Sequence, residues 1–191
     1  MAETLLFHHA QGQTPGFLAF ADELRAAGHV VHTPDLYDAK TFAELDEGVA
    51  YAREVGFETI LERGCVAAES LPTELVYVGL SLGVTPAQKL AQTRPGAKGA
   101  VLLHAAFPPS EFDGAWPQAV PLQIHLMEDD EFALEGDLDA ARELDDTVES
   151  AELFLYPGDR HLFADSSLPD YDEAAARLLM ERVLAFLERV E

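Results

Sequence analysis

Residues 76–84 read VYVGLSLGV, an apolar and β-branched run that leads directly into a serine between two glycines. Gly79 to Gly83 satisfy the pattern G-x-S-x-G, which holds a serine on a sharp turn between a strand and a helix. A turn of this kind strains the serine backbone and places the hydroxyl at a helix N-terminus, whose amides favour developing negative charge. The stretch therefore predicts a strand–turn–helix unit, in which Ser81 is either a nucleophile or part of a tight turn.

Short apolar runs alternate with segments of helical period along the rest of the chain. This alternation predicts a parallel sheet with crossover helices. We expect strands at 5–8, 30–33, 75–78, 100–104, 122–127 and 153–156. Apolar residues repeat with the helical period at Phe17, Phe20, Ala21 and Leu24, at Phe42, Leu45, Val49 and Ala52, and at Leu179, Val183, Phe186 and Val190. The last helix is expected to begin near Tyr171, with Asp170 as its N-cap.

Size and composition fit one α/β domain over residues 1–191. A chain of 191 residues that is 48% apolar can bury one core without disulfides or metals. The single cysteine, Cys65, cannot form an internal disulfide, which favours a reducing compartment. No secretory leader is apparent, and no stretch approaches the roughly 18 continuous apolar residues of a membrane span. We therefore expect a soluble, cytoplasmic protein without a membrane partner.

The charge balance bears on the class of partner. Twelve Lys and Arg against 35 Asp and Glu give a formal net charge of -23, so the mean field repels polyanions. The acids are spread along predicted helix faces, as on a solvated surface. We expect a small-molecule substrate and no nucleic acid, while the sequence carries no signal for an oligomeric state.

Several chemically active residues come just after predicted strands. In an open parallel sheet the C-terminal ends of the strands form one edge, where ligands bind. Ser81, His9, His104, Asp130 and His161 all follow strands in this way. The topology should therefore bring them to a common rim.

A serine nucleophile needs a histidine base, and the histidine needs an acid that fixes its tautomer. In this topology the order is serine, acid, histidine. The turn-rich segment YPGDRHLF at 156–163 makes His161 the strongest candidate for the base. The run EDDE at 128–131 offers four carboxylates for the acid, and nothing in the local sequence favours one of the four. The oxyanion donors should be the amide of Leu82 and one amide of the loop at 8–12, for which we select Ala10.

Two further features enter the prediction. Pro86 lies in the first turns of the helix after Ser81, so we expect that helix to begin late or to bend. Four histidines, His8, His9, His104 and His125, match no zinc spacing, and alternation along strands sends neighbours to opposite faces. We expect no metal and no cofactor.

These residues resemble the dienelactone hydrolase family of α/β-hydrolases over most of the chain. The resemblance rests on the loop at 8–12, TPDLY at 33–37, the turn at Ser81, the acid loop, and Pro157-Gly158 leading to His161. It implies a single-domain α/β-hydrolase fold with a mostly parallel sheet, helices on both faces and little or no lid. It also assigns the triad acid to Asp130, with Asp129 as the fallback.

The chain departs from this family at positions that bear on the substrate. Members that open dienelactones have a cysteine nucleophile and a glutamate in the first loop, where this chain has Ser81 and His9. They also hold a substrate carboxylate with two arginines, whose places correspond to the neighbourhood of Ala39 and to Asp165. Cys65 is expected to be a core residue in a helix. The resemblance therefore implies an esterase-like chemistry but makes dienelactone itself a doubtful substrate.

The predicted function is a serine hydrolase that cleaves a small neutral ester, thioester or lactone with Ser81, Asp130 and His161. Candidate pocket residues are His9, Phe107, Trp116, Phe132 and Phe163. Residues 105–120, stiffened by prolines, leave little sequence for a lid, so the cleft should be open or partly covered. The alternative is a non-catalytic protein of the same fold that binds a small ligand or a protein in the same crevice.

Overall fold

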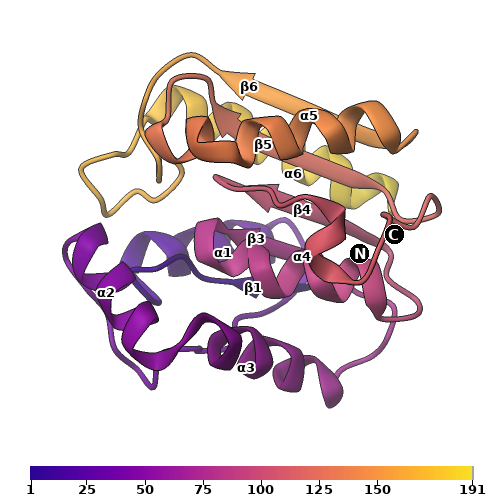
Figure 1. Ribbon diagram of the computed structural model, residues 1–191, viewed down its shortest axis with the longest axis horizontal. Coiled ribbons are helices and arrows are strands. Elements are labelled where there is room, and N and C mark those ends of the chain that lie inside the picture. The colour runs from indigo at the N-terminus through magenta and orange to yellow at the C-terminus, as the bar shows by residue number, and fades with distance from the viewer. Residues whose placement is uncertain (191) are drawn as a thin grey trace.

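The computed structural model describes residues 1–190. Its centre is a six-stranded sheet with the order β2-β1-β3-β4-β5-β6, in which every neighbouring pair is parallel (Figure 1). The strands are β1 (Glu3–Phe7), β2 (Val30–His32), β3 (Val76–Leu80), β4 (Gly99–Leu103), β5 (Leu122–Met127) and β6 (Ala151–Tyr156). Each overlaps its predicted range, and β3 runs two residues further than expected, up to the residue before Ser81. The predicted parallel α/β architecture is confirmed.

Helices cover both faces of the sheet. Helices α1 (Pro15–Ala26) and α6 (Glu173–Arg189) bury their apolar residues in the cluster on one face. The opposite face is covered by α3 (Phe57–Glu69), α4 (Val84–Thr93) and α5 (Leu138–Thr147), and α2 (Leu45–Val55) adds Ala52 to the same cluster (Figure 1). No helix within residues 1–190 has the length and apolar character needed to cross a bilayer.

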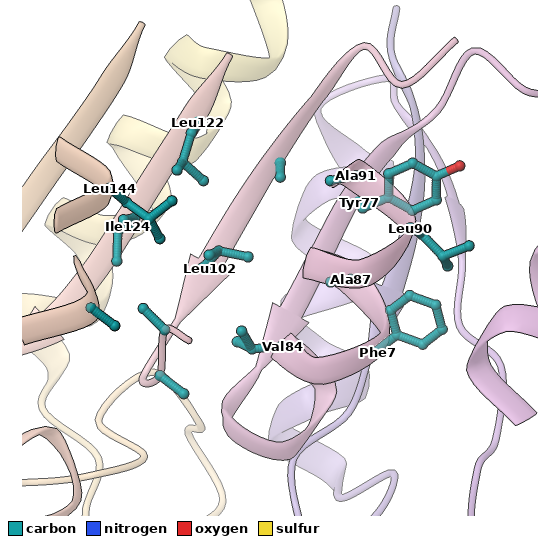
Figure 2. Packing of buried hydrophobic residues seen from close by; sticks show 14 of the residues in the cluster. Phe7, Tyr77, Val84, Ala87, Leu90, Ala91, Leu102, Leu122, Ile124 and Leu144 are labelled. Atoms are coloured by element: carbon teal, nitrogen blue, oxygen red, sulfur yellow. The ribbon is translucent and has the colours of Figure 1, made fainter. Parts of the chain in front are cut away.

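The central strands are apolar on both sides because both sides are buried. Side chains alternate along β3, so Tyr77 faces α4 while Val76 and Val78 face α1 and α6. Figure 2 shows the α4 side of the core, where Val84, Ala87 and Leu90 of α4 lie over the strands that carry Phe7, Tyr77 and Leu102, while Leu122 and Ile124 of β5 lie beside Leu144 of α5. This packing fixes α4, and with it the turn at Ser81, against the sheet.

The start of α6 differs from the prediction. The helix begins at Glu173, and its N-cap is Asp172, whose side chain accepts a hydrogen bond of 3.0 Å from the amide of Ala175. Asp170 and Tyr171 belong to the preceding turn, closed by a bond from the Tyr171 amide to the Leu168 carbonyl. An N-cap residue has an extended backbone, and its side chain accepts a hydrogen bond from the amide two or three residues later. Asp172 meets both conditions.

Pro86 is accommodated by a late helix start. A single 3₁₀ turn covers Ser81–Gly83, and α4 begins only at Val84. Pro86 is therefore the third residue of α4, where an amide would have no intrahelical acceptor. A Cβ atom on Gly64 would lie 2.4 Å from the Cβ of Pro86, so α3 passes α4 closely at this point.

Candidate active site

The backbone around Ser81 is strained and closely packed. Ser81 has φ 50°, in the left-handed region that side-chain-bearing residues rarely adopt. A Cβ atom on Gly79 would lie 2.3 Å from the Gly83 carbonyl oxygen, and one on Gly83 would lie 2.4 Å from that of Phe7. Both flanking positions must therefore be glycine for β1, β3 and the start of α4 to approach one another. A strained residue of this kind costs about 1–3 kcal/mol and is typical of functional sites.

Three side chains from the edge of the sheet form one hydrogen-bonded chain. Ser81 Oγ lies 2.7 Å from His161 Nε2, and His161 Nδ1 lies 2.7 Å from Asp130 Oδ2. Ser81 follows β3, Asp130 follows β5 and His161 follows β6. The parallel topology thus joins residues that are up to 80 positions apart in the sequence.

The acid loop presents one buried carboxylate to His161. Asp130 is 1% exposed, and its second oxygen accepts a bond of 3.0 Å from the Phe132 amide. Glu128, Asp129 and Glu131 are exposed. A carboxylate can only accept, so His161 Nδ1 carries a hydrogen and Nε2 presents its lone pair to the serine hydroxyl. The Phe132 ring packs against the His161 ring at a tilt, with 4.4 Å between the ring centres.

Ser81 and His161 open into an apolar cavity of about 500 Å³. Its walls come from the loop after β1, the turn at Ser81–Gly83, α2, α3, the start of α4, and the segments at 105–112 and 132–137. They include Ala10, Val49, Ala52, Phe57, Leu61, Leu82, Thr85, Ala105, Phe107, Phe112 and Phe132. Leu82 and Ala10 thus lie at the same cavity as Ser81. The segment at 105–112 is tied to α4 because Gln88 both donates to the Phe107 carbonyl at 2.7 Å and accepts from the Phe107 amide at 3.1 Å.

The charged side chains of the cavity wall are acidic. Glu58, Glu111 and Asp137 line it, together with His161, and within residues 1–190 no lysine or arginine lines it. Burial raises the pKa of Asp137 to about 7, opposed by His161 and reinforced by Asp130 and Glu135. Asp137 ends an irregular turn (Ala133–Asp137) before α5. The sequence did not single it out, because nothing local distinguishes it from the other acids of this region.

Of the five predicted pocket residues, Phe107 and Phe132 line the cavity and three do not. Trp116 is buried elsewhere, and its indole Nε1 donates to the Val120 carbonyl at 2.8 Å. Phe163 is fully buried against Tyr156 and His104. His9 is also fully buried and turned toward Asp165. Aromatic character alone does not separate rim positions from core positions.

His9 and Asp165 form a buried pair. His9 Nε2 lies 2.8 Å from Asp165 Oδ2, and Thr14 Oγ1 donates to the same oxygen. The other oxygen accepts from the amide and hydroxyl of Ser167 at 2.9 and 2.7 Å. Burial would raise the pKa of Asp165, but these hydrogen bonds and the neighbouring His9 outweigh it and lower the pKa to about 2. The pair links the loop after β1 to the segment after His161.

Two other sequence candidates take no part in the hydrogen-bonded chain. His104 is buried with φ 69°, and neither ring nitrogen has a hydrogen-bond partner within residues 1–190. Its ring centre lies 6.1 Å from that of His161. Cys65 is half-buried in α3 and packs against the core, where burial raises its pKa. Across residues 1–190, no group of three or more His, Cys, Asp or Glu side chains is arranged to hold a metal ion.

The parallel sheet, the helices on both faces and the serine on its strained turn define an α/β-hydrolase fold. The sequence matches the dienelactone hydrolase family over residues 4–191, and the chain belongs to that family. It is therefore a hydrolase of the α/β type. A comparison with curated proteins finds no match.

Solved structures share this fold at low sequence identity. A dienelactone hydrolase-like promiscuous phosphotriesterase from metagenomic libraries is 17% identical with a TM-score of 0.76, covering 100% of this chain and 87% of its own. A dienelactone hydrolase from Anabaena variabilis is 17% identical with a TM-score of 0.69, covering 99% and 86%. A cold-adapted esterase from an Arctic intertidal metagenomic library is 18% identical with a TM-score of 0.61, covering 95% and 83%. At these identities the likeness concerns the fold.

Proposed function

We propose that the protein is a serine hydrolase that cleaves a small neutral ester, thioester or lactone through an acyl-enzyme. The observation that carries this proposal is the chain of 2.7 Å contacts from Ser81 through His161 to Asp130 at an apolar cavity. A non-catalytic binding protein would have no need for all three side chains in this order and geometry.

In the proposed first step, His161 Nε2 takes the proton of the Ser81 hydroxyl while Oγ attacks the acyl carbon. Asp130 orients the ring and stabilises the imidazolium that forms. The Phe132 amide fixes Asp130 in turn, so the base is held from both sides. This hydrogen-bonded support lowers the cost of reorganisation during proton transfer.

The developing oxyanion would be bound by the amides of Leu82 and Ala10. The Ala10 amide makes no hydrogen bond within residues 1–190, so it is free to donate to a ligand. His161 then gives its proton to the leaving oxygen or sulfur, and the bond to the acyl carbon breaks. Water, activated by the same histidine, attacks the acyl-enzyme and releases the acid and Ser81.

A neutral substrate is favoured by the cavity wall. A volume of about 500 Å³ suits a modest-sized ligand. Glu58, Glu111 and Asp137 would repel a substrate carboxylate, and no lysine or arginine among the described residues of the wall would offset them. Asp165 stands where dienelactone-opening relatives have an arginine, and its carboxylate is hydrogen-bonded to His9, Thr14 and Ser167. These features support neutral esters over anionic lactones.

Labelling with a fluorophosphonate tests the nucleophile. The wild-type protein should be labelled at one site, Ser81→Ala should not be labelled, and Ser70→Ala, which removes an exposed serine at the end of α3, should be labelled like wild type. Absence of labelling in the folded wild-type protein would favour the binding-protein alternative.

A panel of neutral esters and thioesters of increasing acyl length would then define the substrate. The panel should include a neutral phosphotriester, because a structural neighbour is named for that activity. On the best substrate, removal of Ser81 or His161 should lower kcat by about 10⁴ to 10⁶. A loss below about tenfold would exclude the assigned role.

A further inference from the structure

The loop after β1 holds one peptide bond in a defined orientation. The carbonyl oxygen of His9 accepts two hydrogen bonds, from His8 Nδ1 at 2.8 Å and from the Gly12 amide at 3.0 Å. The chain has no cis peptide bond within residues 1–190, so the N–H of Ala10 points opposite to this carbonyl. Fixing the His9 carbonyl therefore also fixes the direction of the Ala10 amide.

The Ala10 amide is unused within the turn, unlike the two amides that follow it. The Gln11 amide donates to His9 Nδ1 at 3.2 Å, and the Gly12 amide donates to the His9 carbonyl. Within residues 1–190 no acceptor engages the Ala10 amide, although Ala10 is only 3% exposed. Since Ala10 lines the same cavity as Ser81, the loop leaves an unused donor where the proposed reaction develops negative charge.

The tautomer of His8 is set by the chain itself. The Leu36 amide lies 3.0 Å from His8 Nε2, and an amide can only donate, so Nε2 is an acceptor. The hydrogen of the neutral ring is then on Nδ1, from which it is donated to the His9 carbonyl. Burial lowers the pKa of His8 to about 4, which keeps the ring neutral at physiological pH. The Tyr37 ring, edge-on at 4.9 Å, packs against His8.

We propose that His8 is a positioning residue that orients the Ala10 amide toward the oxyanion. It does so by donating a hydrogen bond to the His9 carbonyl, which lies on the opposite side of the same peptide bond. This inference rests on the proposed function of Ser81. His8 does not touch the substrate. Its Nε2 accepts a hydrogen bond from the Leu36 amide, in the segment after β2, and this bond fixes the ring. Its Nδ1 in turn fixes the peptide bond that carries the oxyanion donor. His9, anchored on Asp165, completes the brace by engaging the Gln11 amide.

The two ring nitrogens can be tested separately. In His8→Asn the side-chain amide lies near the place of Nδ1 and can still donate to the His9 carbonyl. In His8→Gln it lies near the place of Nε2, where it can still accept from the Leu36 amide but leaves the carbonyl without its side-chain donor. Both variants are neutral, polar and smaller than histidine, so they serve as controls for each other.

We expect His8→Gln to lower kcat on a neutral ester by about 10², near the lower end of the loss of an oxyanion donor. KM should change less than about threefold, because the donor acts on the transition state. His8→Asn should stay within about tenfold of wild type. The fluorophosphonate labelling rate should fall in parallel with kcat, while its endpoint counts intact sites, so kcat is expressed per labelled site.

A matched control is His125→Gln, which changes another fully buried histidine at a distance from the turn. It should lower stability but leave kcat per labelled site within about threefold. Equal kcat losses in His8→Asn and His8→Gln, or no loss in His8→Gln, would overturn the inference. Failure of the proposed function is distinguishable from both, because the wild-type protein itself would then not be labelled.

Discussion

Replacement of His125 should make the stability of the protein less sensitive to acid. His125 is fully buried in β5, where Nδ1 lies 2.8 Å from the Tyr156 hydroxyl and Nε2 lies 2.9 Å from Gln123 Oε1. Burial, with a smaller contribution from the cation of Arg182, lowers its pKa to about 3. In the unfolded chain the pKa is about 6.5.

The sign and size of the effect follow from linkage. Above pH 6.5 both states of the chain leave His125 neutral, and its titration costs nothing. Below pH 6.5 the unfolded state binds a proton that the folded state does not, so stability falls by about 1.4 kcal/mol per pH unit until the folded pKa of about 3 is reached. At pH 4.5 this amounts to about 2.7 kcal/mol, a large part of the stability of a single domain.

His125→Gln removes this titration at the cost of a smaller side chain and one hydrogen bond. We expect it to be less stable than wild type by about 2 kcal/mol at pH 7.5, with the difference closing near pH 5 and reversing below it. Urea unfolding followed by the fluorescence of the single, buried Trp116 measures both curves. A constant difference between pH 7.5 and pH 4.5 would show that folded His125 titrates like the unfolded residue, and would refute the reasoning.

Three further predictions concern the site. Asp130→Asn should lower kcat by about 10³ to 10⁴, because the amide no longer fixes the histidine tautomer, whereas Asp129→Asn should match wild type in the same ester assay. The preference of the wild-type protein for a neutral over an anionic ester of equal size should rise by about tenfold between pH 6 and pH 8, as Asp137 ionises near its pKa of about 7. Asp137→Asn should keep that ratio flat, and a ratio that still rises would assign the effect to another group. His104→Leu should raise the free energy of unfolding by about 1–2 kcal/mol, because both ring nitrogens are buried and unpaired within residues 1–190; a loss of stability in urea unfolding would contradict this.

Much of the architecture follows from local pattern. The β-branched run before Ser81, the glycines around it and the apolar stripe of α1 each depend on residues that are near one another in the sequence. The continuous apolar run predicts a strand that is buried on both faces, and the 3.6-residue period of α1 predicts a helix and the side that it buries. The order of serine, acid loop and histidine was equally visible, because each follows a strand and parallel strands end at one edge.

The start of α6 shows where local pattern was insufficient. Both Asp170 and Asp172 are capping residue types, and the difference lies in the backbone turn at Leu168 to Tyr171. Similarly, Phe107 at the cavity and Trp116 away from it are both aromatic residues of the same loop. Which of them faces the cavity depends on the hydrogen bonds between Gln88 and the Phe107 backbone.

The sequence by itself determined the fold class, the strained turn at Ser81 and the family to which the chain belongs. Only the tertiary structure decided which carboxylate of the acid loop faces His161, that Asp137 reaches the cavity, and that His8 holds the peptide behind Ala10. The physical reason is one of distance. Helices and strands form from residues that are neighbours along the chain. The hydrogen bonds, burial and charges of the site depend instead on residues that are up to 156 positions apart in the sequence, and only the packed sheet brings these residues together.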